Sequence, residues 1–334
     1  MRIGVAGLGG MGVVHARNAL STVGATLVAV ASTRPANAHE VAGALGVRAT
    51  TYDELVAAND IDAIVVAARS IDHARVGCDV LRSGKHLFLE KPGATTLAGH
   101  DALIAEAASR PSQLVQVGYH RRYDAEFVEA QRLVASGAIG EPLLVLSLSR
   151  DVMTPEPEDP IPAGGFLVDM ASHDYDTASW LLGQEPIEAF AARQSTVFPE
   201  LDALGNLDNA VVTVRFGAGG IATTHVSRTC AFGHDVRCEI VGGEGSILIG
   251  NAATRDGLIV LTARDAPKFP VDYRGRFTDA YRGELAAFVA ACSGDGPRGP
   301  DLEDDRRAVA TGVAARASAV DCIPRAVGPD WAWN

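Results

Sequence analysis

Three ionisable residues recur at helical spacing in the segment GGFLVDMASHDYD, which covers residues 164–176. Asp169, His173 and Asp176 fall at i, i+4 and i+7, so a helix would place all three on one face. The residues around them are mostly apolar and predict a largely buried helix. Burying ionisable groups without partners costs several kcal/mol, which is comparable with the net stability of a domain. The face therefore needs a role, and catalysis, metal binding and a polar seam between domains are the alternatives.

A second chemical signature is GLGGMG, a G-x-G-x-x-G pattern that directly follows the first apolar run. Gly7 would allow a tight turn, Gly9 would let the backbone approach a pyrophosphate, and Gly12 would let the next helix pack on a sheet. A helix starting near Gly10 and Met11 would offer N–H groups and a positive dipole end to the phosphates. The pattern predicts a dinucleotide-binding turn, with a ligand-free glycine turn as the alternative.

The end of the second expected strand bears on the choice of cofactor. Folds that select NAD usually place Asp or Glu about 20 residues beyond the glycines, where it binds the ribose 2′-hydroxyl. This chain instead reads Ser32, Thr33 and Arg34. Two hydroxyls and a guanidinium suit a 2′-phosphate, so the sequence favours NADP(H), with NAD(H) as the alternative.

The sequence LEKPG follows the fifth expected strand. Ligands of doubly wound sheets bind at the carboxyl ends of the strands, so Glu90 and Lys91 would lie near the reactive end of a cofactor. Pro92 would fix the course of the chain after them. A solvated loop lysine is the alternative for Lys91.

The first 120 residues alternate short apolar runs with helix-like segments, which predicts a doubly wound parallel sheet, the Rossmann arrangement. The strands are expected at residues 2–7, 26–32, 46–50, 62–68, 85–90 and 113–118. Beyond residue 120 the strands are longer and alternate with period two, which predicts a large, mostly antiparallel sheet with helices on one side. The α/β chain should therefore consist of an NAD(P)-binding domain at 1–119 and an α+β domain at 120–334.

The second half also carries signals for individual elements. Its expected strands are PLLVLSLSRDV, NAVVTVRF, IATTHVSRT, DVRCEIVG and SILIG, with hairpin turns at GAGG (217–220) and GGEG (242–245). Four prolines in 152–165 predict a loop, and residues 281–294 and 303–320 predict two surface-packed helices.

Composition excludes several classes of protein. The formal net charge of −12 argues against a nucleic-acid partner, because phosphate binding needs clustered Lys and Arg. The longest apolar runs fall far short of the roughly 20 residues of a membrane helix, and no signal-peptide pattern is present, so a cytoplasmic protein is expected. Five scattered cysteines without a CxxC pair support neither a zinc ribbon nor a disulfide framework.

The joint pattern of GxGxxG at the start, EKP at 90–92 and GGxxxDxxxHxxD at 164–176 resembles the Gfo/Idh/MocA family of nicotinamide-dependent oxidoreductases. Residues 116–127 and 276–288 are similar to stretches of its inositol 2-dehydrogenases. The resemblance implies hydride transfer from a secondary hydroxyl of a cyclitol or sugar, with Lys91, Asp169 and His173 as catalytic residues. His173 would be the base, Asp169 would orient its ring, and Lys91 would hydrogen-bond the reacting oxygen.

The resemblance also implies contacts outside these motifs. For the cofactor it adds Ala68 and His73. For the substrate it adds Tyr119, Arg122, Asp176 and His234, with supporting ion pairs as the alternative for Arg122 and Asp176. No metal is expected, and relatives suggest that the domain at 120–334 binds substrate and forms the contacts of a homodimer or homotetramer.

Two departures from the inositol enzymes bear on the substrate. Arg69 lies in the stretch where many family members have Thr-Pro, and it could narrow the site or bind a carboxylate or phosphate. Residues 232–235 read Phe-Gly-His-Asp where those enzymes have Tyr-Gly-Tyr-Asp. A different sugar or cyclitol is therefore an alternative to inositol.

Two further functions compete with the dehydrogenase. A metal-dependent hydrolase would use Asp169, His173 and Asp176 as ligands, but it would leave the glycine turn unexplained. A non-catalytic NADP(H) sensor would need neither a base nor an electrophile. The combination of Lys91, Asp169 and His173 therefore favours the dehydrogenase.

Overall fold

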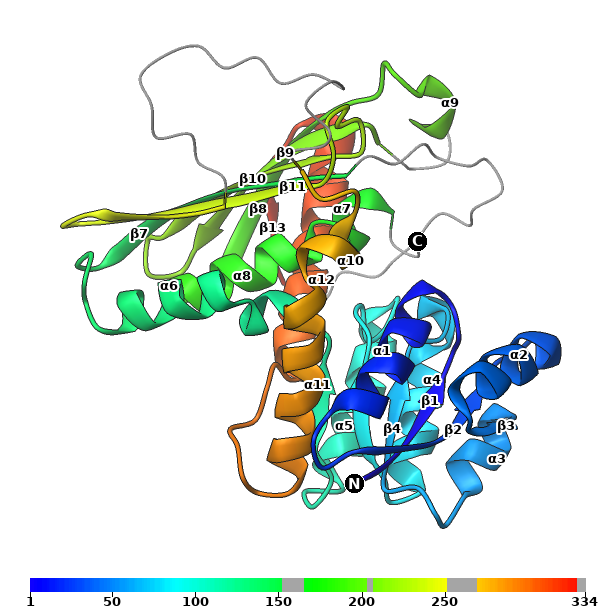
Figure 1. Ribbon diagram of the computed structural model, residues 1–334. Helices are drawn as coiled ribbons and strands as arrows, with labels where there is room; N and C mark the ends of the chain where they lie inside the picture. Colours follow the sequence, from blue (N-terminus) through cyan, green and yellow to red (C-terminus); the bar gives the residue numbers. More distant parts are fainter. Residues whose placement is uncertain (152–164, 203–206, 251–268, 329–334) are drawn as a thin grey trace. The chain divides into compact units, whose positions relative to one another are not determined.

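The computed structural model describes residues 1–151, 165–202, 207–250 and 269–328. The chain divides into two compact units (Figure 1). The first contains Met1–Tyr123 together with Asp279–Arg306, and the second contains Asp124–Thr278 and the segment that starts at Arg307. The division expected from the sequence, at residue 119, assigned all later residues to the second domain. The structure instead groups Asp279–Arg306 with the first unit, because this segment supplies part of that unit's core.

The first unit is built on a six-stranded sheet in the order β3-β2-β1-β4-β5-β6, with every neighbouring pair parallel. This is the strand order of the Rossmann fold, with its switch point between β1 and β4. The structure thus confirms the predicted parallel sheet. The strands are β1 (Arg2–Ala6), β2 (Thr26–Ala31), β3 (Arg48–Thr50), β4 (Ala63–Val66), β5 (His86–Leu89) and β6 (Val115–Val117).

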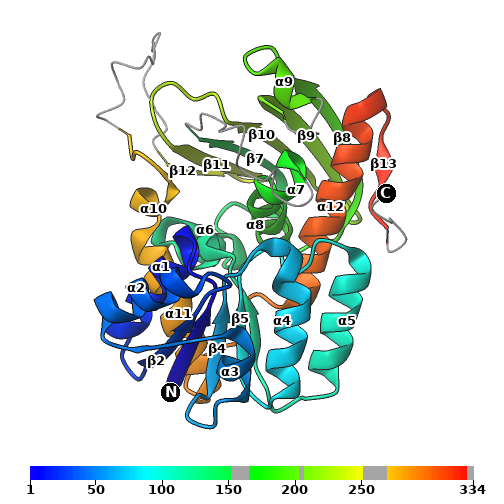
Figure 2. The same cartoon turned by 90° about the vertical axis from the view of Figure 1, so that its right-hand side faces the viewer.

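Helices cover both faces of this sheet. One face carries α1 (Gly10–Ser21), α2 (Pro35–Leu45) and α11 (Thr278–Cys292), whose Leu285, Phe288 and Val289 pack on Ile3, Val65 and Phe88. The other face carries α3 (Tyr52–Ala57), α4 (Ser70–Arg82) and α5 (Leu97–Ala108), and Figure 2 shows the last two side by side. A single-turn 3₁₀ helix, η1 (His120–Tyr123), follows β6.

The second unit is built on a seven-stranded sheet in the order β12-β11-β7-β10-β9-β8-β13. Among the described strands of this sheet, only the pair β7 and β10 is parallel, so the predicted mostly antiparallel sheet is confirmed. Both predicted glycine hairpins join antiparallel neighbours. The strands are β7 (Pro142–Arg150), β8 (Pro186–Gln194), β9 (Asn209–Phe216), β10 (Ile221–Ser227), β11 (Asp235–Gly242), β12 (Ser246–Ile249) and β13 (Arg325–Ala326).

Helices α8 (Ser172–Leu182) and α12 (Leu302–Asp321) pack against one face of the second sheet. Residues 308–315 of α12 are all buried, so this helix is not the surface-packed element expected from its sequence. Small residues permit this burial, and the Cα of Gly312 lies so close to α7 (Phe166–Asp169) that a Cβ there would be 3.0 Å from the carbonyl oxygen of Leu167. The remaining helices are α6 (Ala125–Ala135), α7 (Phe166–Asp169), α9 (Pro199–Asp202) and α10 (Tyr273–Arg276).

The prediction omitted β8 and β13, and the expected loop at 152–165 lies outside the described residues except for Gly165. Of the described helices, none combines the length and the hydropathy that crossing a membrane requires.

Candidate active site

The turn after β1 has backbone contacts that only glycine permits. Gly7 has φ +100°, and a Cβ there would lie 2.3 Å from the carbonyl oxygen of Ala67, just after β4. A Cβ at Gly12 would lie 1.9 Å from the carbonyl oxygen of Gly7, so α1 packs directly on the turn. A Cβ at Gly9 would meet nothing within 4 Å. This leaves open space at the N-terminus of α1, which fits the close approach of a pyrophosphate.

The residues after β2 lie at the same edge of the sheet, because all its strands are parallel. Thr33 and Arg34 are exposed, and Ser32 accepts a hydrogen bond from the backbone N–H of Arg34 (N···Oγ 3.2 Å). Asn37 donates its side-chain amide to the carbonyl oxygen of Leu8 at 3.1 Å, which ties α2 to the glycine turn. The segment therefore offers hydroxyls and one cation to a ligand that follows the turn.

His73 forms hydrogen bonds with both of the loops that follow β4 and β5. It is buried, with Nδ1 2.8 Å from the carbonyl oxygen of Pro92 and Nε2 3.0 Å from that of Ala68. Both ring nitrogens are thus engaged by the protein backbone. The structure therefore gives His73 a role in positioning the two loops rather than in direct contact with a cofactor.

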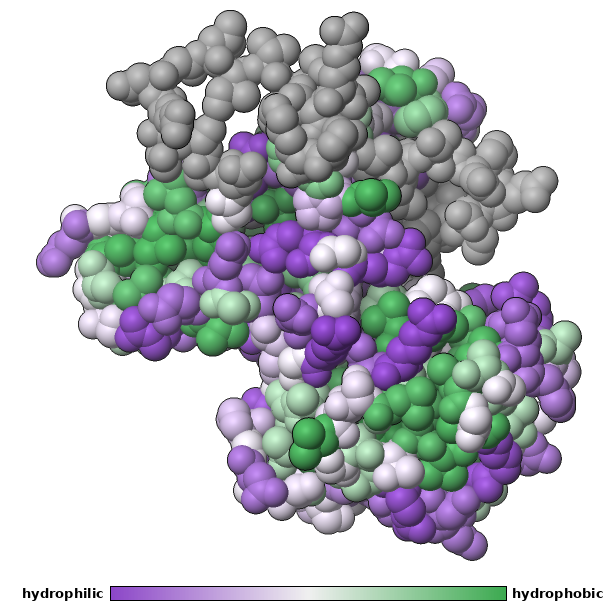
Figure 3. Space-filling model, viewed as in Figure 1, coloured by the Kyte–Doolittle hydropathy of each residue, from purple (hydrophilic) through white to green (hydrophobic). Residues whose placement is uncertain are grey.

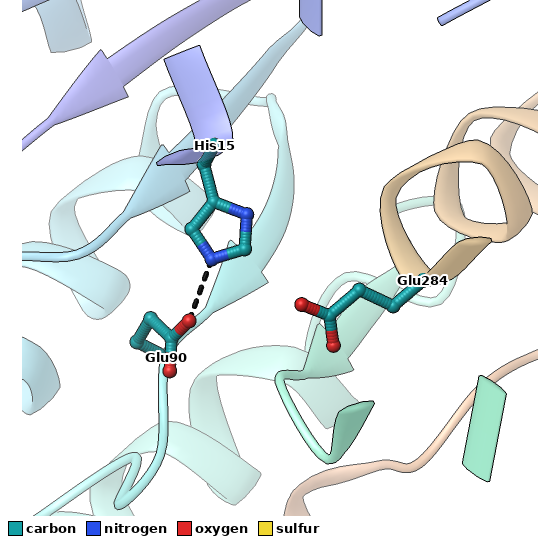
Figure 4. Close-up of side chains that lie close together, drawn as sticks. All are labelled: His15, Glu90 and Glu284. Carbon is teal, nitrogen blue, oxygen red and sulfur yellow. Dashed lines mark hydrogen bonds and ion pairs between the residues drawn. The ribbon is translucent and has the colours of Figure 1, made fainter. Parts of the chain in front are cut away.

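Glu90 is buried and turned inward from the loop after β5. Its Oε1 lies 2.6 Å from Nε2 of His15 on α1, and its Oε2 accepts the backbone N–H of Lys91 at 3.2 Å. Figure 4 shows this pair together with Glu284 of α11. Lys91 itself is half-buried. Glu90 therefore holds the backbone of Lys91 from the interior.

A buried aspartate holds the next part of the same loop. Asp305 is fully buried, and its carboxylate accepts from the backbone N–H of Gly93 (2.7 Å), from Nε2 of His100 (2.7 Å) and from the hydroxyl of Tyr119 (2.8 Å). Tyr119 is 1% exposed. Its hydroxyl is engaged by Asp305 in the protein interior, and the contact of Tyr119 with substrate stays a prediction.

Two arginines of the first unit form ion pairs with acidic neighbours. Arg122 pairs with Asp304 (3.0 Å) and keeps only 13% of its side chain exposed, so the ion-pair alternative for this residue is the one observed. Arg69 pairs with Asp72 at 3.2 Å and is 75% exposed. Its exposure allows it to leave Asp72 for a ligand at little cost.

In the second unit, the predicted single helix around the ionisable residues is interrupted. Gly165, with φ +71°, directly precedes α7, which ends at Asp169, and α8 begins at Ser172. Asp169 and His173 are half-buried, whereas Asp176 is 2% exposed. The three residues therefore do not form one uniform face. Asp169 lies in α7, and Asp176 is buried because α8 is packed on nearly all sides. Asp169 and His173 retain the access that catalysis needs, and Asp176 does not.

Two further charged residues near this region, Asp174 and Arg228, are buried, and no pattern in the sequence indicated a role for them. Asp174, in the first turn of α8, accepts from the hydroxyl of Ser149 on β7 (2.8 Å). Arg228, just after β10, is 6% exposed, with its guanidinium carbon 5.2 Å from the ring centre of Phe166. Burial lowers the pKa of Arg228, and the charges of Asp169 and two other aspartates oppose that shift. Arg228 is therefore a local positive charge near Asp169.

His234 lies in the turn before β11 and is 5% exposed. Its Nδ1 hydrogen-bonds to the carboxylate of Asp151, just after β7, and its ring meets Phe277 edge-on at 6.0 Å. This partner explains the histidine in Phe-Gly-His-Asp, because His234 joins two strand ends of the sheet. The burial of His234 does not support the predicted contact with substrate.

The comparisons with known proteins agree with this architecture. A myo-inositol 2-dehydrogenase of Thermotoga maritima is 32% identical over 323 residues, covering 95% of this chain and 96% of that protein. An inositol 2-dehydrogenase of Rhizobium meliloti is 32% identical over 328 residues, covering 96% and 97%.

Solved structures show the same fold. A scyllo-inositol dehydrogenase of Lactobacillus casei with bound NAD(H) and scyllo-inositol has a TM-score of 0.86 at 26% identity, covering 98% of this chain and 99% of its own. A family model described as an oxidoreductase family with an NAD-binding Rossmann fold matches residues 1–119, and a GFO/IDH/MocA C-terminal domain matches residues 127–248. The chain is therefore an oxidoreductase of the GFO/IDH/MocA family, with an NAD-binding Rossmann domain at its N-terminus.

Proposed function

We propose that the protein is a dehydrogenase that oxidises a secondary hydroxyl of a cyclitol or sugar. The observation that carries this proposal is the turn after β1, where Gly7 and Gly12 are packed against backbone and Gly9 faces open space. Inositol dehydrogenases are similar to this chain over nearly its whole length, which supports an inositol-like substrate. The nicotinamide ring, when bound, accepts the hydride.

Three residues of this chain would act on the substrate. The hydroxyl can release hydride only as its proton leaves, so the proposal assigns that proton to the imidazole of His173. Asp169, the last residue of α7, would orient the imidazole ring of His173, which lies in the first turn of α8. Lys91 would donate a hydrogen bond to the same oxygen and stabilise its developing negative charge. Gly7, Gly9, Gly10, Met11 and Gly12 would hold the pyrophosphate.

For the cofactor, the proposal favours NADP(H) over NAD(H). Ser32, Thr33 and Arg34 follow β2, at the position from which Rossmann folds contact the ribose, and no carboxylate occurs among residues 32–37. The exposed guanidinium of Arg34 supplies the charge that a 2′-phosphate needs.

The open face of the second sheet favours self-association. On this face Leu146, Phe190, Val211 and Ile221 are between 36% and 45% exposed. Figure 3 shows hydrophobic residues at the left end of this unit, and the four side chains named above are exposed on the open face. Large exposed apolar patches usually mark interfaces, so the proposal includes a homodimer or homotetramer, and sedimentation velocity measures its mass.

A substrate screen tests the function. The purified protein is mixed with NADP or NAD and a panel that includes myo-inositol, scyllo-inositol and several sugars, and formation of the reduced nicotinamide is followed by its absorbance. We expect turnover with at least one cyclitol or sugar, and His173→Ala to be the matched inactive control. Cofactor binding without turnover of any polyol would favour the sensor instead, and loss of turnover on chelation would favour a metal enzyme.

A further inference from the structure

The core of the first unit contains a carboxyl group whose oxygens accept no hydrogen bond from the described residues. Glu284, in the middle of α11, is 0% exposed, and neither of its carboxyl oxygens has a partner there. Figure 4 shows the group turned toward the pair formed by His15 and Glu90. One ligand atom from each of the three residues lies within 4.8 Å of the others. An isolated buried carboxylate at this place would cost several kcal/mol, so the group needs a proton or a cation.

The surroundings of Glu90 show which group that carboxyl meets. Oε1 of Glu90 is 2.6 Å from Nε2 of His15, and Oε2 accepts the backbone N–H of Lys91. Behind it, a Cβ at Gly118 would lie 3.3 Å from the carboxyl carbon of Glu90, so the carboxylate is enclosed. Gln116 fixes the helix beside it by donating to the backbone carbonyl of Glu284 at 2.9 Å.

A proton suits this cluster better than a metal ion. The 2.6 Å between His15 and Glu90 is a hydrogen-bond distance, whereas two ligands of a tetrahedral zinc ion with bonds near 2.1 Å lie about 3.4 Å apart. The titratable groups around Glu284 are His15 on α1, Glu90 after β5, and Tyr281 one turn earlier on α11, with His120 of η1 stacked on Tyr281 (ring centres 4.6 Å apart). Burial first, and then the charge of Glu90, raise the pKa of Glu284 well above its ordinary value.

We propose that Glu284 is a positioning residue: as a neutral carboxylic acid within 4.8 Å of Glu90 it turns its O–H toward that carboxylate, and it thereby fixes the group that holds the backbone N–H of Lys91. The helix α11 thus contributes to the placement of Lys91 through Glu90. The consequence for catalysis rests on the proposed dehydrogenase function, but the protonation of Glu284 does not.

Folding stability tests the protonation directly. A carboxyl with a raised pKa in the folded protein stabilises fully below the unfolded pKa and loses that contribution as pH rises toward the folded pKa. The matched variant is Glu284→Gln, which is neutral at every pH and can turn an N–H toward Glu90 in the same way. The folding equilibrium constant is measured by urea unfolding near pH 5 and near pH 7. For each unit by which the pH rises, the constant of the wild type should fall about tenfold relative to that of the variant. The same pH dependence in both proteins would overturn the proposal.

Catalysis tests the positioning. We expect Glu284→Gln to keep kcat within about threefold, while Glu284→Leu, which has no donor, lowers kcat at least tenfold with little change in cofactor affinity. Equal kcat for the Leu variant and the wild type would remove the positioning role. Elemental analysis that finds one divalent ion per chain, absent from the Gln variant, would replace the proton by a metal. If no polyol is turned over, the proposed function fails while the unfolding comparison still decides the protonation.

Discussion

Substitution by alanine should have different effects at two glycines of the same turn: it should lower stability at Gly12 and weaken cofactor binding at Gly9. At Gly12 an added Cβ would lie 1.9 Å from the carbonyl oxygen of Gly7, which is main chain and cannot rotate away. Overpacking of this kind costs about 1–3 kcal/mol or more, and a backbone contact belongs at the upper end. Alanine is more favourable than glycine in a helix by up to about 1 kcal/mol, which offsets part of this cost. We therefore expect Gly12→Ala to destabilise the first unit by about 2 kcal/mol.

At Gly9 the same change should leave stability nearly intact and weaken the cofactor. The residue caps α1 with φ −75°, which alanine adopts easily, and no atom lies within 4 Å of the added Cβ. Poorer capping costs at most about 1 kcal/mol. The methyl group would occupy the space through which a pyrophosphate reaches the backbone. Loss of one charge-assisted hydrogen bond is worth about 1.5–3 kcal/mol, which corresponds to roughly 10- to 100-fold weaker binding.

Thermal unfolding and equilibrium titration with NADH and NADPH measure the two effects separately. For Gly12→Ala, about 2 kcal/mol corresponds to a fall in Tm of roughly 4–8 °C in a unit of this size. Gly9→Ala should unfold within a few degrees of the wild type. If Gly9→Ala binds both cofactors as tightly as the wild type, the turn does not hold a pyrophosphate. An unchanged Tm for Gly12→Ala would refute the packing argument.

Three further variants test separate parts of the structure. Arg34→Ala should weaken NADPH binding at least tenfold more than NADH binding, and an equal loss for both in the same titration would exclude a 2′-phosphate contact. Asp305→Asn removes the anion that accepts from Gly93, so we expect a Tm several degrees lower and, at permissive temperature, a reduced kcat; retention of both would contradict its anchoring role. The hydrogen bond from Arg2 lowers the pKa of Asp62 to about 2. Its stabilisation is present above pH 4 and is lost as pH falls through 2, so the Tm difference between Asp62→Asn and the wild type should shrink over that interval, and a constant difference would refute the assignment.

The sequence predicted the elements whose signals are local. The central parallel strand β4 is a continuous apolar run, AIVV, and both hairpins carry their turn residues between alternating strands. The strand β8 reads PIEAFAARQ, in which alanine and glutamate outweigh β-branched residues, so its own propensity does not favour a strand. Pairing with β9 decides its structure. The division into domains likewise depends on the packing of α11 on the first sheet, which periodicity cannot assign to one sheet or the other.

The candidate site shows the same limit at the level of single residues. The turn residues Gly7, Gly9 and Gly12 have a fixed spacing, and the structure gives each the environment that the spacing predicts. The partners that hold the loop around Lys91 come from far along the chain. His15 and Glu90 are 75 residues apart, and Gly93 and Asp305 are 212 apart. The resemblance implied a substrate contact for Tyr119, whereas its hydroxyl donates to Asp305, which reads in the sequence as one more acid of a polar helix start.

These long-range contacts have a consequence for how the loop that carries Lys91 is held. The backbone N–H groups of Lys91 and Gly93 donate to two different buried carboxylates, Glu90 and Asp305, and each carboxylate also contacts a buried histidine. Because a buried carboxylate that loses a donor is strongly destabilised, movement of the loop would cost energy at both ends at once. The lysine therefore keeps its backbone position through the core of the Rossmann unit, and its side chain alone needs to adapt when a substrate hydroxyl arrives.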